Sequence, residues 1–184
     1  MNAERMQKCE NLITNIKGVI LMTVNLNIMV GAPGSGKSTY IAVNAGGEDV
    51  IISRDAIRYE MVAEDEPYFS KEKAVFKEYC DQINAAGADG VERTIWADAT
   101  QLSPQSRKKL LDKLELNLFD NIRFVILETD IKTCLQRNGQ RSGRGHVPDD
   151  TLINMYNSIS YPNAAEILSY GARPSLFSLI HVTK

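Results

Sequence analysis

The sequence predicts an α/β fold in which a parallel sheet carries helices on both faces. Strongly apolar runs such as Val24–Val30 and Ile122–Leu127 are typical of strands that are buried on both sides. Segments with apolar residues at helical spacing separate these runs, as the crossover connections of a parallel sheet require. A glycine-rich turn at residues 31–38 joins the first strand directly to a helix. This turn indicates where in the fold a ligand would bind.

The strands follow from short apolar runs bounded by polar or turn-forming residues. After the first strand, Val24–Val30, the chain alternates between helix and strand and contains no internal repeat. The other strands are predicted at Val50–Ile52, Thr94–Ala97, Ile122–Leu127 and Phe177–Val182.

The helices follow from periodicity and capping. Lys37–Asn44 comes directly after the glycine-rich turn, and Lys71–Ala86 is an amphipathic helix. Ser103 and Pro104 are a typical N-cap and first helical residue. The buried stripe of the helix that they begin is predicted to comprise Leu110, Leu111, Leu114 and Leu118. Two further helical stretches are expected around Thr133 and Leu152.

The chain of 184 residues is long enough for one domain with its own core. We expect residues 1–22 to be an N-terminal extension, helical or loose, with Met22 as an alternative start, and residues 23–184 to form the domain. A net charge of −2 argues against a protein that coats nucleic acid with a broadly basic surface. Three widely spaced cysteines and the absence of a membrane-length apolar stretch in the sequence favour a cytoplasmic location.

The glycine-rich turn satisfies the P-loop pattern G-x-x-x-x-G-K-S/T, between a strand and a helix as the pattern requires. Backbone N–H groups of such a loop surround the β-phosphate of a nucleotide, the lysine contacts the β- and γ-phosphates, and the hydroxyl binds Mg²⁺. We therefore predict that Lys37 holds ATP and that Ser38 is a ligand of Mg²⁺. The full ATP-binding loop is predicted to be Gly31, Ala32, Pro33, Gly34, Ser35, Gly36, Lys37, Ser38 and Thr39.

The loop alone does not distinguish GTPases, motor ATPases and kinases. The sequence contains neither a guanine-reading N-K-x-D motif nor an apolar run that ends in D-E, so a kinase is favoured. The predicted fold is accordingly a P-loop kinase-like one.

Charged residues at the carboxyl ends of two strands indicate where an acceptor would bind. Arg54, Asp55 and Arg58 follow the second strand, and Asp98 ends the third. Asp55 could take a proton from an attacking hydroxyl, and Arg58 could grip a phosphate of the acceptor. Asp98 could orient Arg58 or hold a magnesium-bound water.

A segment rich in arginine and glycine predicts a mobile lid. Arg137, Arg141 and Arg144 would lie on one face if the helix around Thr133 continued through them. Such arginines suit closure over the phosphates of ATP, with Arg141 the first choice for the phosphate that is transferred.

Four blocks, G-A-P-G-S-G-K-S-T, S-R-D-A-I-R, W-A-D-A-T-Q-L-S-P-Q-S-R and L-Q-R-N-G-Q-R-S-G-R-G-H-V-P, strongly resemble the 5′-kinase domain of bacteriophage-type polynucleotide kinases. The resemblance covers residues 24–159. It implies ATP and Mg²⁺ as cofactors, the 5′-hydroxyl end of a nucleic acid as substrate and Asp55 as general base. It also implies that Arg58 contacts the acceptor, that Asp98 supports Arg58, and that Arg137 and Arg141 belong to the lid. This chain has Ala56 where the family has a second acidic residue.

Two other functions fit the same residues. A kinase of a small alcohol, such as a sugar acid, a nucleoside or an antibiotic, differs only in the size of its acceptor. A regulatory or toxin-like protein would bind the nucleotide without catalysis.

Tyr59 and Tyr68 could stack on an acceptor base, whereas Trp96 is expected in the core. Arg107, Lys108 and Lys109 are expected on the exposed face of their helix.

Overall fold

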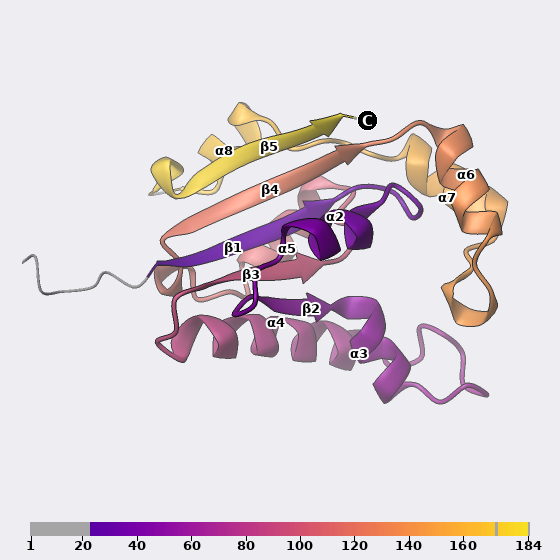
Figure 1. Cartoon of the computed structure of the whole chain (residues 1–184), viewed down its shortest axis with the longest axis horizontal. Coiled ribbons are helices and arrows are strands. Elements are labelled where there is room, and N and C mark those ends of the chain that lie inside the picture. Colours follow the sequence, from indigo (N-terminus) through magenta and orange to yellow (C-terminus); the bar gives the residue numbers. More distant parts are fainter. Residues whose placement is uncertain (1–22, 172, 184) are drawn as a thin grey trace, which may run out of the picture.

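The computed structural model of the chain describes residues 23–171 and 173–183, and the predicted N-terminal extension lies outside them. Five parallel strands form one sheet with the order β2-β3-β1-β4-β5 (Figure 1). The strands are β1 (Val24–Val30), β2 (Val50–Ser53), β3 (Arg93–Asp98), β4 (Asn121–Glu128) and β5 (Phe177–Thr183). The predicted parallel α/β fold and all five predicted strands are confirmed.

Helices connect every pair of successive strands. They are α2 (Lys37–Asn44), α3 (Arg54–Met61), α4 (Glu72–Ala88), α5 (Pro104–Leu111), α6 (Ile131–Gly139), α7 (Asp149–Asn157) and α8 (Ala164–Ser169). Short 3-10 turns η1 (Leu116–Leu118), η2 (Gly143–Gly145) and η3 (Pro174–Leu176) complete the connections. No helix within residues 23–171 or 173–183 is long and apolar enough to cross a membrane.

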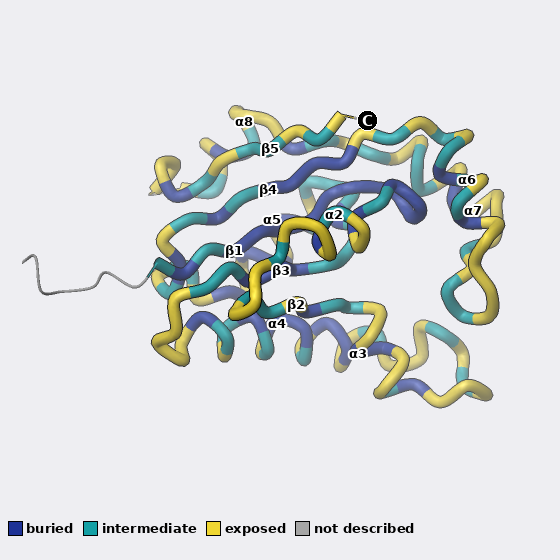
Figure 2. The backbone as a smooth tube through the Cα atoms, viewed as in Figure 1, coloured by how far each residue is buried: buried dark blue, intermediate teal, exposed yellow. Residues whose placement is uncertain are grey.

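The two faces of the sheet are covered unequally. One face packs against α4, α5 and α8 in the larger core, in which alternate β1 residues such as Leu26 and Ile28 are fully buried. The other face packs against α2, where Met29, Ile41 and Trp96 form a smaller cluster. The alternation along β1 follows from the period of two in a strand, and Figure 2 shows the resulting buried centre. The expectation that Trp96 belongs to the core is confirmed.

The helix that begins at Ser103 is shorter than its apolar pattern suggested. Its capping box is present: the hydroxyl of Ser103 accepts from the Ser106 backbone N–H, and the hydroxyl of Ser106 accepts from that of Ser103. The helix ends at Leu111, and Leu118 lies in the separate turn η1, only partly buried. A stripe of leucines therefore marked the buried side of this segment correctly but not the end of the helix.

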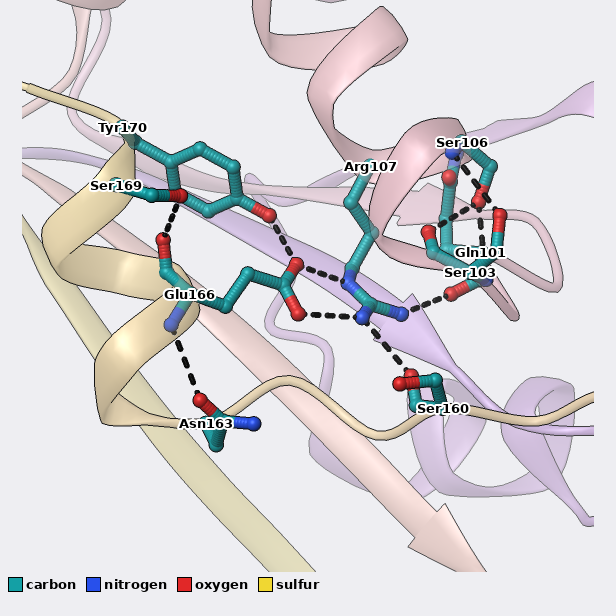
Figure 3. Close-up of polar contacts among 9 residues, drawn as sticks. All are labelled: Gln101, Ser103, Ser106, Arg107, Ser160, Asn163, Glu166, Ser169 and Tyr170. Carbon is teal, nitrogen blue, oxygen red and sulfur yellow. Dashed lines mark hydrogen bonds and ion pairs between the residues drawn. The ribbon is translucent and has the colours of Figure 1, made fainter.

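The exposed position predicted for Arg107 is wrong. Its side chain is fully buried and forms an ion pair with Glu166 of α8, with nitrogen–oxygen distances of 2.6 and 2.7 Å (Figure 3). It also donates to the carbonyl oxygens of Gln101 at 2.8 Å and Ser160 at 2.9 Å. Lys108 and Lys109 are exposed as expected. Arg107 thus ties α8 to the loop that follows β3.

Candidate functional site

The P-loop, residues 31–38, runs from the end of β1 into α2, and its glycines are needed where the backbone turns or is closely approached. Gly36 is the N-cap of α2 with a left-handed φ of 97°. Gly34 has a φ of 79°, and a Cβ atom there would lie 2.5 Å from the carbonyl oxygen of Cys134. No side chain caps α2, and the buried hydroxyl of Ser35 has no hydrogen-bond partner among the residues described. These free donors suit an anion at the helix N-terminus.

Lys37 lies inside this loop rather than on the surface. Its ammonium group donates to the carbonyl oxygens of Gly31 at 2.9 Å and Ala32 at 3.0 Å. Burial lowers the pKa of Lys37, and the charge of Arg141 lowers it further, whereas Asp98 and Asp55 raise it. Charges from β3, α3 and the lid therefore act on one ammonium group.

Asp98 lies beside Ser38, at the end of β3 next to β1. The Ser38 hydroxyl donates to Asp98 Oδ2 at 3.2 Å. Burial raises the pKa of Asp98, and Lys37 and the Ser38 hydroxyl partly oppose that rise. The loop that follows β3 also contacts the P-loop, because the N–H of Gly31 donates to the carbonyl oxygen of Thr100 at 3.0 Å.

The pair of Ser38 and Asp98 fits a magnesium ion by its chemistry. Both groups offer hard oxygen donors, and Mg²⁺ is typically held by one or two protein oxygens together with substrate phosphates and waters. A closed metal cage of three or more His, Cys, Asp or Glu side chains is absent from residues 23–171 and 173–183. The donor set suits an ion that arrives with a nucleotide.

The first turn of α3 presents Asp55 at the carboxyl edge of β2. The Ser53 hydroxyl caps this helix by accepting from the N–H of Ala56 at 3.3 Å. The side chain of Asp55 is 64% exposed, and its carboxylate accepts from Arg58 and from the Tyr68 hydroxyl, the latter at 3.0 Å. Burial, with a contribution from Asp55, raises the pKa of Tyr68 to about 12, so the phenol is a donor at neutral pH.

The sequence did not reveal that one carboxylate, Glu72, pairs with both acceptor-side arginines, Arg54 and Arg58. It lies at the start of α4 and pairs with Arg54 and with Arg58, the latter at 2.8 Å. Burial disfavours the charge of Arg58, but hydrogen bonds with Glu72 and Tyr68 hold its pKa above the usual range. Arg58 is only 4% exposed, and its guanidinium also lies 4.7 Å from the ring centre of Tyr68.

The expected contact between Asp98 and Arg58 is not among the hydrogen bonds and ion pairs of the described residues. Asp98 bonds to Ser38 instead, and Glu72 occupies the supporting position beside Arg58. No pattern in the sequence links Arg58 to Glu72, because the two lie 14 positions apart with a loop between their helices.

The lid arginines do not share one helical face. The helix α6 ends at Gly139, so Arg141 lies in the following turn and Arg144 in η2. Arg137 donates to the Gly34 carbonyl oxygen of the P-loop at 3.2 Å. Arg141 is exposed, and its charge acts on the pKa values of both Lys37 and Asp98. Arg144 instead donates to the Val62 carbonyl oxygen, at 2.9 Å, just beyond α3.

The site therefore has two sides. On one side, Lys37 and Ser38 of the P-loop lie with Asp98, Arg137 and Arg141. On the other, Asp55 and Arg58 of α3 and Glu72 of α4 form a connected group with Tyr68 from the segment between these helices. The lid reaches both, through Arg137 on one side and Arg144 on the other.

Comparison with known proteins agrees with this arrangement. The model of a family described as AAA domain matches residues 26–162, which include every residue of the site above. A search of the curated proteins gave no match.

Several solved structures share the fold. A chain of the Pnkp1/Rnl/Hen1 RNA repair complex superposes with a TM-score of 0.62 at 22% identity over 77% of this chain. This chain spans only 46% of that one. A sugar kinase from Janibacter sp. HTCC2649 has a TM-score of 0.55 at 18% identity, with 88% of this chain and 85% of that chain covered. A fungal RNA kinase has a TM-score of 0.52 at 9% identity, with 87% and 75% covered. At these identities the likeness establishes a P-loop kinase-like fold and not an acceptor.

Proposed function

The chain belongs to the AAA domain family, and from that premise we propose that it is an ATP-dependent polynucleotide 5′-hydroxyl kinase. It would transfer the γ-phosphate of ATP to the 5′-hydroxyl end of DNA or RNA. The observation that carries the proposal is Asp55, an exposed carboxylate oriented by Arg58 and Tyr68 at the strand edge beside the P-loop. A nucleotide switch would have no need of an oriented base on the acceptor side of its cleft.

On the donor side, the P-loop N–H groups and Lys37 would bind the phosphates of ATP. Lys37 would exchange its two carbonyl partners for phosphate oxygens, which stabilise the ammonium charge better than neutral acceptors do. Mg²⁺, held through Ser38 and with Asp98 beside it, would neutralise charge on the phosphate oxygens. Arg137 and Arg141 would stabilise the negative charge of the transferring phosphoryl group from the lid.

On the acceptor side, Asp55 would accept the proton of the attacking hydroxyl as the bond to phosphorus forms. Arg58 and Tyr68 both donate to Asp55 Oδ1, which leaves Oδ2 to face the hydroxyl. An acceptor phosphate could reach Arg54 or Arg58 only by competing with Glu72, which pairs with both. We therefore assign Arg58 first to the orientation of Asp55 and second to the acceptor.

A kinase of a small alcohol is the second candidate. It is favoured by the acidic segment Glu64–Glu66 after α3, because carboxylates close to the acceptor side repel a long polyanion. It uses the same Asp55 and the same donor side, so the acceptor has to be identified by assay.

The test is phosphate transfer from γ-labelled ATP to a panel of acceptors. The panel contains 5′-hydroxyl DNA and RNA oligonucleotides, nucleoside 3′-monophosphates and sugars. Under the proposal the oligonucleotides are labelled at their 5′ ends, and labelling of sugars alone would replace it with the second candidate. ADP release without any labelled acceptor would favour a nucleotide-binding regulatory protein.

Asp55→Asn should lower the single-turnover rate on the preferred acceptor by about 10² to 10⁴, the usual contribution of general base catalysis. Affinity for ATP should change little, because Asp55 lies on the acceptor side. Asp112→Asn is the matched control, an aspartate of similar exposure at the end of α5 that, among the described residues, pairs only with Lys108. An Asp55→Asn protein as fast as the parent would remove Asp55 from the mechanism.

A further inference from the structure

A pocket of about 760 Å³ lies between the acceptor-side helix and the lid. One wall is the C-terminal end of α3 with the loop after it, including Tyr59 and Glu64. The other wall is the lid around η2, including Ser142 and Arg144. The pocket is separate from the P-loop and shares no lining residue with it.

The pocket adjoins Asp55 through two tyrosines. Tyr59 lies four residues after Asp55 on α3, so the two side chains are neighbours on one face of the helix. The ring centre of Tyr59 is 6.3 Å from that of Tyr68, whose hydroxyl donates to Asp55. A substrate with its hydroxyl at Asp55 would therefore extend the rest of its body toward Tyr59.

Two cations line the pocket, and within the described part of the chain only Lys71 is paired with a carboxylate. Arg144 donates to the Val62 carbonyl oxygen, and its guanidinium lies 5.1 Å from the ring centre of Tyr59. Lys71 pairs with Glu66 at 2.9 Å and donates to the Met61 carbonyl oxygen at 2.8 Å. Glu66 thus balances the charge of Lys71, whereas Arg144 has no carboxylate partner among the described residues and its Nη2 has no hydrogen-bond partner there.

The acids of the pocket, by contrast, are available. Within residues 23–171 and 173–183, neither Glu60 nor Glu64 takes part in an ion pair or a side-chain hydrogen bond, although both line the pocket and are exposed. Carboxylates accept hydrogen bonds and repel anions. Two open carboxylates, Glu60 and Glu64, line the pocket together with one guanidinium that has no carboxylate partner among the described residues, so the pocket suits an uncharged, flat group with N–H donors better than a phosphate.

We propose that this pocket receives the nucleobase of the acceptor's 5′-terminal nucleotide, which stacks on Tyr59 while Glu60 and Glu64 face its N–H groups. The inference rests on the proposed function and adds a base subsite to it. Tyr59 is 41% exposed, so part of its ring remains open to a base, and Arg144 holds the ring from the lid. Every base has a face that can stack, so the subsite favours the presence of a base more than its identity.

The test compares two 5′-hydroxyl oligonucleotides that differ only in the first residue, which is normal in one and abasic in the other. Base–aromatic stacking predicts that the parent protein uses the normal acceptor with a kcat/KM roughly tenfold higher or more. In Tyr59→Ala the preference should fall to about twofold or less. Tyr59→Phe keeps the ring and should keep the preference, which separates stacking from a general loss of structure.

Equal use of the two acceptors by the parent protein would overturn the inference and leave the kinase proposal intact. An equal loss on both acceptors in Tyr59→Ala would overturn it as well, because Tyr59 would then act on the site as a whole. Transfer to sugars alone would overturn the kinase proposal and the base subsite together.

Discussion

Two buried arginines in this molecule have similar partners and different surroundings. Arg58 pairs with Glu72 and Asp55 and donates to a tyrosine, Tyr68. Arg107 pairs with Glu166, which also accepts from a tyrosine, Tyr170. The difference lies in the carboxylates: the side chain of Asp55 is 64% exposed and that of Glu166 only 8%.

This difference separates an arginine that serves a site from one that holds the fold together. The Arg58 group ends in a carboxylate that faces the cleft, so part of its charge is available to a ligand. The Arg107 group is closed, since the guanidinium donates only to Glu166 and to two backbone carbonyls within the described residues (Figure 3). Arg107 donates to the carbonyl oxygen of Gln101, and the carbonyl oxygen of the preceding residue, Thr100, accepts from the N–H of Gly31 in the P-loop. Arg107 therefore fixes a segment that contacts the P-loop.

Arg107→Met should have the largest effect on stability. It leaves Glu166 buried without its cation, and breaking a buried pair by removing one partner typically costs about 3 to 5 kcal/mol. The free energy of unfolding, measured by urea denaturation, should fall by that order. Lys108→Met is the matched control, because Lys108 is exposed and, in the part of the chain that the structure describes, pairs only with Asp112. A loss in Arg107→Met no larger than in this control would show that the buried pair does not hold the fold.

Arg58→Met should affect activity more than stability. Glu72 keeps its pair with Arg54 and both carboxylates reach solvent, so the free energy of unfolding should fall by only about 1 to 2 kcal/mol. Asp55 loses one of its two orienting donors, and misplacement of a catalytic group can lower the rate about 10²-fold. Paired measurement of unfolding and single-turnover rate checks this. A stability loss equal to that of Arg107→Met, with normal turnover in the folded fraction, would erase the contrast.

The Arg107 pair should also make stability depend on pH in the acid range. Burial alone would raise the pKa of Glu166, but hydrogen bonds from Arg107 and Tyr170 lower it below its usual value of 4.5. A carboxyl with a lowered folded-state pKa adds stability above its unfolded pKa, and this stability is lost as the pH falls through the folded value. The stability difference between the parent and Glu166→Gln should therefore be greatest near neutral pH and shrink below about pH 4.5. A difference that stays constant from pH 7 to pH 3 would contradict the assignment.

Local sequence patterns were sufficient to predict the strands, the P-loop and the start of α5. The P-loop is a contiguous motif whose glycines and lysine act within eight residues, and the strand β1 is recognisable because its apolar side chains are buried on both faces. The convergence of Asp55 and Asp98 on the P-loop edge was also predictable, because parallel strands place their carboxyl ends together.

The tertiary structure alone decided which partners the charged residues have. Arg107 was expected on the exposed face of its helix, because no local pattern shows that α8 brings Glu166 to it from 59 positions away. In the same way, the spacing of Arg137, Arg141 and Arg144 fitted one helix. The helix ends at Gly139, however, and Arg144 donates to the carbonyl oxygen of Val62 just after α3. A sequence pattern reports the conformation of neighbouring residues, whereas a charge is paired or exposed according to what the fold packs against it.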